Sequence, residues 1–381
     1  DKESGELVLH NYMDFDNLKD YVKISYELTQ DGLLIGKGKL AEVSVVPHSE
    51  GKTNLQVNVP ENGKCYLKLT YHLKKEMPLL EEDYILGFDE IEVSQKDAKC
   101  QLAEKWVEKT VTDSELQVSE DDTQIHIKGR EFAYTIDRRT ALFTEMKFAG
   151  REYLNHPMEL NIWRAPTDND MYIKSEWKKA HYDKAYTRAY TTEVVQGKHG
   201  VKITSHASVV AETVQKILDV TITWKIEAAG KIDADIAVTK DDEFPDLPRF
   251  GVRMFLDKKL SDARYFGMGP QESYRDKHQA ASHGLYRANV RDLHEDYIRP
   301  QENGSHYDCE YVELNNSRYG IVVSAENAFS FNASYYTQEE LEEKTHNYEL
   351  TESDSVVFCV DYALNGIGSN SCGPVVLEQY R

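Results

Sequence analysis

Cysteine is scarce in this chain, and its placement excludes two common uses of the residue. The 381 residues include five cysteines, which are widely spaced and form no Cys-x-x-Cys pair. An odd number without short spacing argues against a disulfide framework and against a structural zinc site. We therefore expect a reducing cytoplasm. The five are Cys65, Cys100, Cys309, Cys359 and Cys372.

The chain also lacks a long apolar run and an excess of positive charge. Apolar residues make up 40% of it, but no run approaches the roughly 20 residues of a membrane span. The formal net charge is −21, and such a surface repels phosphate backbones and anionic lipid. We expect no nucleic-acid partner and no membrane partner.

Motifs for phosphate binding, metallopeptidase or serine-hydrolase chemistry are missing as well. There is no HExxH, no GxSxG and no Walker loop, and Gly36-Lys37-Gly38 is a lone turn signal. The residues alone therefore assign no catalytic group and no metal ligand. The chain starts at Asp1 and not at a methionine, so we expect it to begin inside a longer protein or after processing.

What the sequence does contain is period-two alternation, which predicts β-strands with one buried face. It is clear in four early segments, and the strongest hairpin pattern spans 218–240, with Gly230 at its turn. Helix signals are few, and the best spans 337–346, with Thr337 at the N-cap and Glu340 at the capping-box position. The four segments are "VKISYELTQ", "NLQVNVP", "YLKLTYHL" and "ILGFDEIEV".

The spacing of these strands predicts an all-β chain of two domains. Short strands with turn signals over 1–95 predict an immunoglobulin-like β-sandwich. Residues 96–114 are polar and rich in Lys and Glu, so we interpret them as a linker, with a helical turn around Trp106. Strands resume over 115–381, a region too large for one small sandwich and suited to a very large two-layer one.

Three segments concentrate polar groups at strand ends. "LNIWRAPTDND" (160–170) joins a Trp, an Arg and an Asp-Asn-Asp cluster, which either brace the turn or line a polar site. "YFGMGPQESYRD" (265–276) presents Glu272, Tyr274, Arg275 and Asp276 together after two glycines. "NGIGSNSCGP" (365–374) is a Gly-rich loop that can bring small polar groups to a ligand. Side chains of these types favour a carbohydrate site.

These segments, in this order and together with "LPRFGVRMFLD", resemble the C-terminal part of bacterial β-galactosidases of glycoside hydrolase family 2. The resemblance implies an immunoglobulin-like domain followed by a galactose-mutarotase-like β-supersandwich that completes the rim of the sugar site. It implies β-galactosides such as lactose as substrates of the parent enzyme. The substrate-binding residues it suggests are Arg164, Asp168, Asn169, Asp170, Tyr172, Asn370 and Cys372.

The resemblance also implies what this chain does not carry. Retaining glycosidases need two carboxylates about 5 Å apart, and in the family both are glutamates on a (β/α)₈ barrel that precedes these domains. The family's magnesium ligands lie on the same barrel, so no cofactor is expected in this chain. The barrel is then a partner, and the parent enzyme can form a homo-oligomer.

Two details of the resemblance concern loops. In the family, the turn after the Arg-Ala-Pro motif leads into a loop at the active-site entrance, here about Tyr172 to His181, whose root the Asp-Asn-Asp cluster would brace. Some members carry a Trp in the last Gly-rich loop that stacks on the outer sugar, whereas Cys372 stands near that place here.

Two other functions stay open at this point. One is a free-standing sugar epimerase on the mutarotase-like fold, which needs a general acid and base such as Glu272 and His283. The other is a carbohydrate-binding module without chemistry. A barrel upstream of Asp1 would favour the β-galactosidase interpretation.

Overall fold

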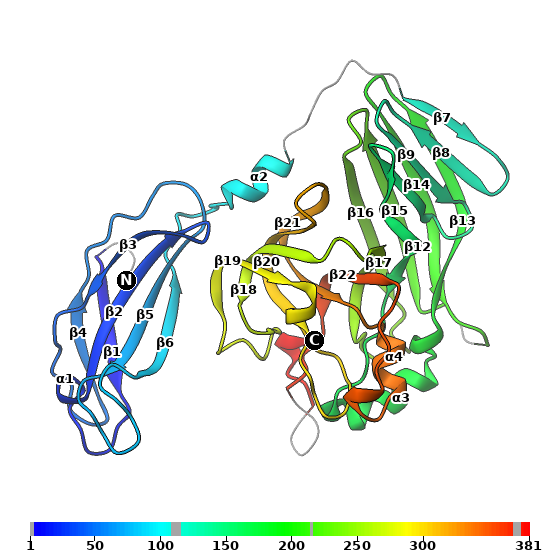
Figure 1. Cartoon of the computed structure of the whole chain (residues 1–381). Helices are drawn as coiled ribbons and strands as arrows, with labels where there is room; N and C mark the ends of the chain where they lie inside the picture. Colours follow the sequence, from blue (N-terminus) through cyan, green and yellow to red (C-terminus); the bar gives the residue numbers. More distant parts are fainter. Residues whose placement is uncertain (1–3, 108–115, 214–215, 369–374) are drawn as a thin grey trace. The chain divides into compact units, whose positions relative to one another are not determined.

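A computed structural model describes residues 4–107, 116–213, 216–368 and 375–381 of the chain. The chain divides into two compact units. The first comprises Asp1–Val107 with Ser282–Leu285, and the second comprises Glu108–Ala281 with Tyr286–Arg381. Strands dominate both units (Figure 1), which confirms the predicted all-β fold class.

The first unit contains a four-stranded antiparallel sheet, in the order β3-β2-β5-β6, and a two-stranded sheet, β1-β4. A buried cluster of Leu9, Ile24, Val45, Leu67 and Leu69 forms its core. Its elements are β1 (Glu6–Asn11), α1 (Leu18–Tyr21), β2 (Val22–Gln30), β3 (Leu33–Lys39), β4 (Ser49–Asn54), β5 (Cys65–Leu73), β6 (Ile85–Glu92) and α2 (Gln101–Val107).

One predicted strand of this unit is wrong. The alternation in "NLQVNVP" (54–60) predicted a strand there, but the strand is β4, which ends at Asn54. Beyond it, Leu55 N donates to Gly5 O, and residues 55–60 have no strand assignment. Pro60 has no N–H to give to a ladder, so a continuation of the strand toward it is disfavoured. α2 lies in the segment where a helical turn was expected.

The second unit is built from three antiparallel sheets of five, seven and four strands. Their orders are β11-β10-β9-β8-β7, β12-β17-β22-β21-β20-β18-β19 and β13-β14-β15-β16. The strands are β7 (Gln117–Glu120), β8 (Gln124–Lys128), β9 (Phe132–Asp137), β10 (Leu142–Phe148), β11 (Arg151–Glu152), β12 (Leu154–Asn161), β13 (Tyr186–Gln196), β14 (Gly200–Val210), β15 (Leu218–Glu227), β16 (Ile232–Lys240), β17 (Arg249–Asp257), β18 (Asp262–Gly269), β19 (Ser282–Asn289), β20 (Ser305–Asn315), β21 (Gly320–Ser334) and β22 (Ser355–Leu364).

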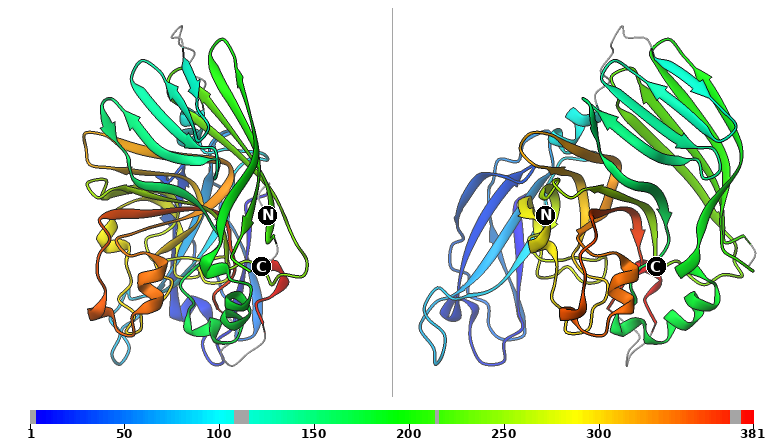
Figure 2. Two further views of the ribbon diagram at one scale, coloured as in Figure 1. Left: turned by 90° about the vertical axis from the view of Figure 1, so that its right-hand side faces the viewer. Right: turned by 45° about the vertical axis from the view of Figure 1, so that its right-hand side comes forward.

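One continuous core joins the three sheets. Buried residues from each sheet belong to it, such as Ile136 of β9, Ile222 of β15 and Phe358 of β22. The predicted hairpin 218–240 is confirmed as β15–β16, with Gly230 at φ +92° in the turn. The apolar face of β15 is buried, whereas β16 is half-exposed because it is the outer strand of its sheet. Figure 2 shows the strands of this unit in layered sheets.

The helices α3 (Ile173–Lys179) and α4 (Gln338–Glu343) lie near one end of the second unit, which we call its helical end (Figure 1). α4 begins after Thr337, whose hydroxyl accepts from Glu340 N at 3.1 Å, so the predicted cap is confirmed. Glu340 itself accepts from Thr351 N at 2.8 Å. The 3₁₀ turns of this unit are η1 (Asp168–Met171), η2 (Tyr182–Lys184), η3 (Val290–Leu293), η4 (Asn347–Glu349) and η5 (Glu378–Tyr380).

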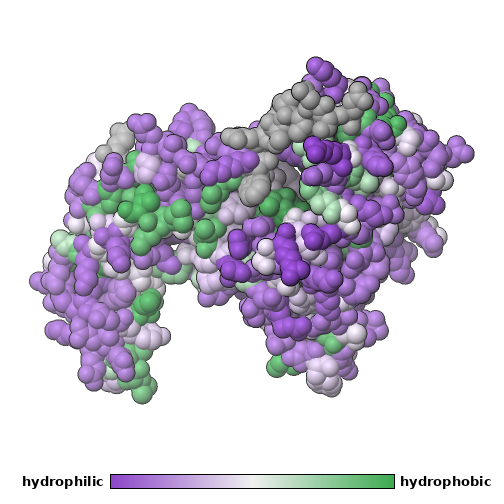
Figure 3. Space-filling view, turned by 45° about the horizontal axis from the view of Figure 1, so that its top comes forward, coloured by the Kyte–Doolittle hydropathy of each residue, from purple (hydrophilic) through white to green (hydrophobic). Residues whose placement is uncertain are grey.

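The face of the molecule drawn in Figure 3 is mostly hydrophilic, as the net charge of −21 leads one to expect. Within the described ranges, no helix combines the length and the apolar character needed to cross a bilayer.

Candidate functional site

The turn after β12 is organised around one buried carboxylate. Asp170 Oδ2 accepts from the backbone N of Thr167 at 2.9 Å and from its hydroxyl at 3.2 Å. Asp170 N donates back to Thr167 O at 2.9 Å. These reciprocal bonds close the first turn of η1, as a capping box does. The turn is therefore hydrogen-bonded to itself, one of the two options that the sequence left open.

Arg164 pairs with the same carboxylate. Its Nε lies 3.1 Å from Asp170 Oδ2 and its Nη2 lies 2.7 Å from Oδ1, a bidentate geometry. Both residues are almost fully buried, with exposed fractions of 1% and 3%. The guanidinium also lies over the ring of Trp177, 5.2 Å from its centroid. An ion pair in this position orients backbone around it, and it presents little surface to a ligand.

The segment that follows β22 is held by this pair and by its neighbour. Arg164 donates from Nη1 to Asn365 O at 2.5 Å and from Nη2 to Gly366 O at 3.1 Å. Asn169 Nδ2 donates to Ile367 O at 2.7 Å. The Arg-Ala-Pro and Asp-Asn-Asp residues thus brace the chain at 365–367, about two hundred positions away in sequence.

The carboxylate of Asp276 binds the backbone N–H groups of the same segment. Its Oδ1 accepts from Ile367 N at 3.0 Å, and its Oδ2 accepts from Gly368 N at 2.8 Å. A Cβ atom at Gly366 would lie 2.6 Å from Asp276 Oδ2, so the close approach requires glycine there. Together with Asn365 N to Pro248 O and Gly366 N to Tyr380 O, these contacts satisfy the backbone N–H and C=O groups of residues 365–367.

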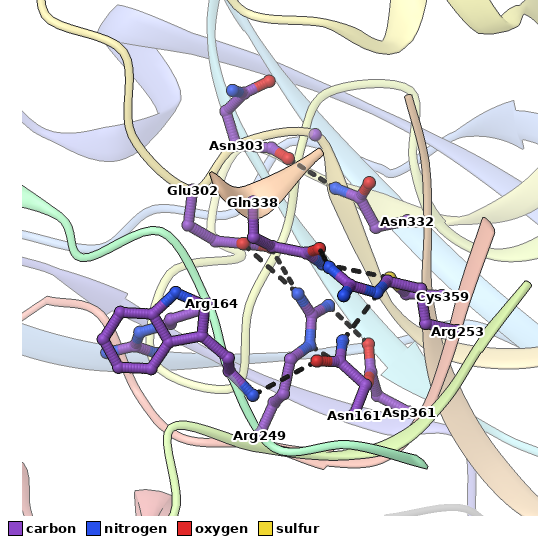
Figure 4. Close-up of polar contacts among 12 residues, drawn as sticks. Asn161, Arg164, Arg249, Arg253, Glu302, Asn303, Asn332, Gln338, Cys359 and Asp361 are labelled. Atoms are coloured by element: carbon purple, nitrogen blue, oxygen red, sulfur yellow. Dashed lines mark hydrogen bonds and ion pairs between the residues drawn. The ribbon is translucent and has the colours of Figure 1, made fainter. Parts of the chain in front are cut away.

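A second buried arginine lies beside the first network (Figure 4). Arg249 donates to Asp361 at 3.1 and 2.6 Å and to both oxygens of Glu302 at 3.3 Å. Burial alone would lower the pKa of Arg249, but the two carboxylates outweigh it and raise that pKa. Burial raises the pKa of Glu302, which shares its cation with Asp361. Glu302 N also donates to Ala165 O at 3.0 Å, which joins the two networks.

Arg253, which lies on β17 like Arg249, extends this network of buried ion pairs. It donates to Glu159 at 2.8 and 2.6 Å and to Glu339 at 2.9 and 3.0 Å, and it contacts Gln338 (Figure 4). Gln338 Nε2 lies 3.2 Å from the thiol of Cys359. Charged side chains of β12, β17, β22 and α4 are thereby paired inside or at the edge of one sheet.

The residues considered for epimerase chemistry are each engaged in their own unit. Glu272, in the second unit, accepts from Lys277 at 2.5 Å, from Gly304 N at 2.9 Å and from the Tyr297 hydroxyl. Burial would raise the pKa of Glu272, but these donors lower it overall. His283 belongs to the first unit, where its Nδ1 lies 2.7 Å from Glu90. Neither observation favours a free acid–base pair.

Of the remaining predicted sugar-site residues, two lie at the surface and two lie outside the described residues. Asp168 N donates to Gln301 Oε1 at 3.0 Å, and Tyr172 is exposed, so both lie at the surface of the helical end. Asn370 and Cys372 lie outside the described residues. Sugar contact by all seven stays a prediction. The sequence motifs that contain Asp276 and Arg249 were recognised in the sequence. Their contacts, with the backbone at 367–368 and with Asp361, were not predicted.

No group of three or more His, Cys, Asp or Glu side chains within residues 4–107, 116–213, 216–368 and 375–381 is arranged to hold a metal ion. Asp170 and Asp361 are paired with arginines and Glu272 with a lysine, whereas Asp276 accepts from backbone N–H groups.

Comparison with protein families agrees with this architecture. A model described as the β-galactosidase small chain matches residues 128–381. A second model, described as β-galactosidase domain 4, matches residues 7–94. The class is thus the paired all-β domains of glycosidases, and the chain belongs to the β-galactosidase family.

Curated relatives are similar over nearly the whole chain. A β-galactosidase of Actinobacillus pleuropneumoniae is 42% identical over 99% of this chain and 36% of its own length. Those of Staphylococcus xylosus and Lactobacillus delbrueckii subsp. bulgaricus are 30% and 28% identical, over 38% and 36% of their lengths. The chain therefore spans little more than a third of the length of these three relatives.

Proposed function

We propose that this chain is the C-terminal, non-catalytic portion of a β-galactosidase of glycoside hydrolase family 2. The observation that carries the proposal is the match itself, which covers both units but only about a third of each relative. The whole protein would hydrolyse terminal β-galactose residues from substrates such as lactose.

In this proposal the chain completes the rim of the sugar site and the catalytic groups come from elsewhere. A retaining glycosidase needs an acid/base and a nucleophile about 5 Å apart. Glu272, which was considered for acid–base chemistry, already accepts hydrogen bonds from Lys277 and from Gly304 N. The preceding (β/α)₈ barrel would supply both glutamates, and it would be the main partner of the helical end of the second unit.

The geometry supports this role through the braced segment 365–368. Arg164, Asn169 and Asp276 fix its backbone, and it leads directly into the Gly-rich stretch that the resemblance assigns to the sugar rim. Near the same anchor, Met171 at the end of η1 and Tyr172 between η1 and α3 have exposed side chains. Rigid anchors under exposed loops are a common way to present binding groups.

Three further properties belong to the whole protein. In this proposal any magnesium would bind to the barrel, where the resemblance places the family's ligands. Assembly of the whole enzyme into a homo-oligomer is part of the proposal. We also propose a reducing cytoplasmic location, which is supported by the buried thiols of Cys65, Cys309 and Cys359, none of which forms a disulfide in the described part of the chain.

The test is hydrolysis of nitrophenyl-β-galactoside. Purified chain should release no nitrophenol, whereas the same chain extended at its N-terminus by the region that its relatives carry should turn the substrate over. The control is the extended protein with the two barrel glutamates replaced by glutamine. Turnover by the chain alone, after host β-galactosidase is removed, would contradict the proposal.

A further inference from the structure

The first unit pairs a wide sheet with a sheet that is too narrow to cover it. The four-stranded sheet β3-β2-β5-β6 faces the two-stranded sheet β1-β4, because Leu9 of β1 shares a buried cluster with Leu67 and Leu69 of β5. Neighbouring strands lie about 4.8 Å apart, so two strands span roughly half the width of four. Sandwiches of the immunoglobulin type use about seven strands, whereas residues 4–107 form six.

The poorly covered edge of the wide sheet is β6. Directly opposed residues of an antiparallel pair point to the same face. Ile91 lies opposite Leu67 and Gly87 lies opposite Tyr71, so both belong to the core side of the sheet. Leu67 is 3% exposed, but Ile91 is 36% exposed. A Cβ atom at Gly87 would meet nothing within 4 Å. The core side of β6 is therefore open.

A groove of about 410 Å³ lies at this edge, between β1 and β6. Its apolar lining comes from Leu7 and Leu9 of β1, Leu69 and Tyr71 of β5, and Ile91 of β6. Among the strands that the structure describes, β1 pairs with β4 alone, so its other edge has no strand partner. The N–H and C=O groups of such an edge are a template for a further strand.

The polar lining of the groove is acidic. It comprises Glu6, Asp89 and Glu90. Glu6 and Glu90 are paired with Lys52 and His283. Asp89 is exposed and accepts from a tyrosine hydroxyl at 2.5 Å, and a carboxylate of this kind has lone pairs for a further donor. An occupant with a basic side chain or a backbone N–H near Asp89 would match this lining.

A further strand can join β1 or β6, but the two positions differ in what they cover. A strand joined to β6 would extend the wide sheet and leave Ile91 open. A strand joined to β1 would widen the narrow sheet and lie over Gly87, Asp89 and Ile91, at the usual spacing of about 10 Å between packed sheets. The position beside β1 is the one that completes the sandwich.

We propose that the free edge of β1 binds an extended strand from the part of the β-galactosidase that lies outside this chain. The inference rests on the proposed function for the existence of that part, and this chain covers between 36% and 38% of the length of three relatives. Alternate apolar side chains of the added strand face Gly87 and Ile91. Main-chain hydrogen bonds to β1 hold it, as in other cases of β-strand addition.

The experiment compares hydrogen exchange in this chain and in the parent protein, which is the chain extended at its N-terminus by the region that its relatives carry. The amides on the free edge of β1 should exchange at least about tenfold more slowly in the parent protein. The edge strand β3 is the control and should exchange equally in both. Exchange reports backbone pairing and not turnover, so its result is independent of whether the protein hydrolyses galactosides.

A matched pair of variants tests the groove. Ile91→Asp places a charge under the added strand, so it should remove most of the extra protection of β1 in the parent protein. Leu33→Asp is the control, because Leu33 is an exposed apolar residue of β3 that does not line the groove, and it should leave that protection unchanged. Protection of β5 in both variants shows that the first unit remains folded.

Two outcomes would overturn the proposal. If the free-edge amides of β1 exchange equally fast in the chain and in the parent protein, no strand of the parent occupies the groove. If these amides are already protected in the chain alone and lose that protection on dilution, a second copy of the chain occupies it instead.

Discussion

At the scale of single residues, the main finding is that an Arg-Asp pair that looks like a ligand-binding pair is an internal brace. Arg164 and Asp170 face each other at 2.7 and 3.1 Å with almost no exposed surface. A buried pair adds little net stability compared with apolar packing, but the loss of one partner leaves an uncompensated charge. The pair is therefore sensitive to changes that keep its shape and remove its charge.

We expect Asp170→Asn to lower the free energy of unfolding by about 3–5 kcal/mol, because it leaves the Arg164 guanidinium buried without its anion. Urea unfolding of the variant and of the parent chain measures the difference. Glu176→Gln is the control, since it breaks an exposed pair with Lys179 on the nearby helix α3 and should cause no measurable change. Equal effects of the two substitutions would mean that the Arg164 site is solvated.

His306 makes a second prediction at this scale, on pH. It is buried against Tyr265 and Phe331, its Nε2 has no partner, and burial lowers its pKa to about 4. The unfolded chain binds a proton here near pH 6.5, whereas the folded chain does so only near pH 4. Stability is therefore complete above pH 6.5 and is lost as the pH falls toward 4, by up to about 3 kcal/mol from this residue.

The measurement is the free energy of unfolding at several pH values between 7 and 4. His306→Phe keeps the aromatic stacking and removes the titrating group, so the slope over this range should flatten. The carbonyl of Met268 still accepts from the Ser273 hydroxyl in that variant. His199→Gln, at an exposed position, should leave the slope unchanged. An unchanged slope in His306→Phe would show that other groups set the acid sensitivity.

At the scale of elements, residues 365–368 after β22 belong to no strand, and side chains from distant parts of the chain hold their backbone. The order of this segment comes from side chains of two distant motifs and not from a ladder of its own. Glycine at 366 allows the chain to pass within contact distance of the Asp276 carboxylate.

Gly366→Ala should therefore destabilise the chain by about 1–3 kcal/mol, the usual cost of forcing extra atoms into a packed site. Gly87→Ala in β6 is the control, because a Cβ atom at Gly87 meets nothing within 4 Å. That substitution should be neutral or slightly stabilising. Melting temperatures of both variants test the contrast, and a tolerated Gly366→Ala would show that Asp276 can move away.

At the scale of the whole molecule, the chain has two units with separate cores. Leu67 belongs to the core of the first and Ile222 to the core of the second. Chains with two cores commonly depart from two-state unfolding. Calorimetry should therefore resolve two transitions.

Truncations in the two cores should assign those transitions. Leu67→Ala should lower only the transition of the first unit, and Ile222→Ala only that of the second, each by about 2–5 kcal/mol. A single transition that both variants shift equally would mean that the units unfold together.

The sequence by itself determined the elements and the class of the fold. Alternating apolar residues specify strands because a pleated strand places successive side chains on opposite faces, and this pattern located β2, β5, β6 and the β15–β16 hairpin. The N-cap at Thr337 was also predictable, because it depends only on residues within one helical turn. The pattern failed at 54–60, where the strand ends before the alternating residues begin. The quoted motifs also sufficed to indicate the family.

Only the tertiary structure decided what the polar motifs do. Asp276 reaches Ile367 across 91 positions, Arg249 reaches Asp361 across 112, and Arg164 reaches Gly366 across 202. Periodicity reports on neighbours within a strand or a turn, whereas these pairs meet only because the shared core fixes the order and register of β12, β17 and β22. The open core side of β6 is equally invisible in sequence, because alternation predicts a strand but not what lies opposite its apolar face.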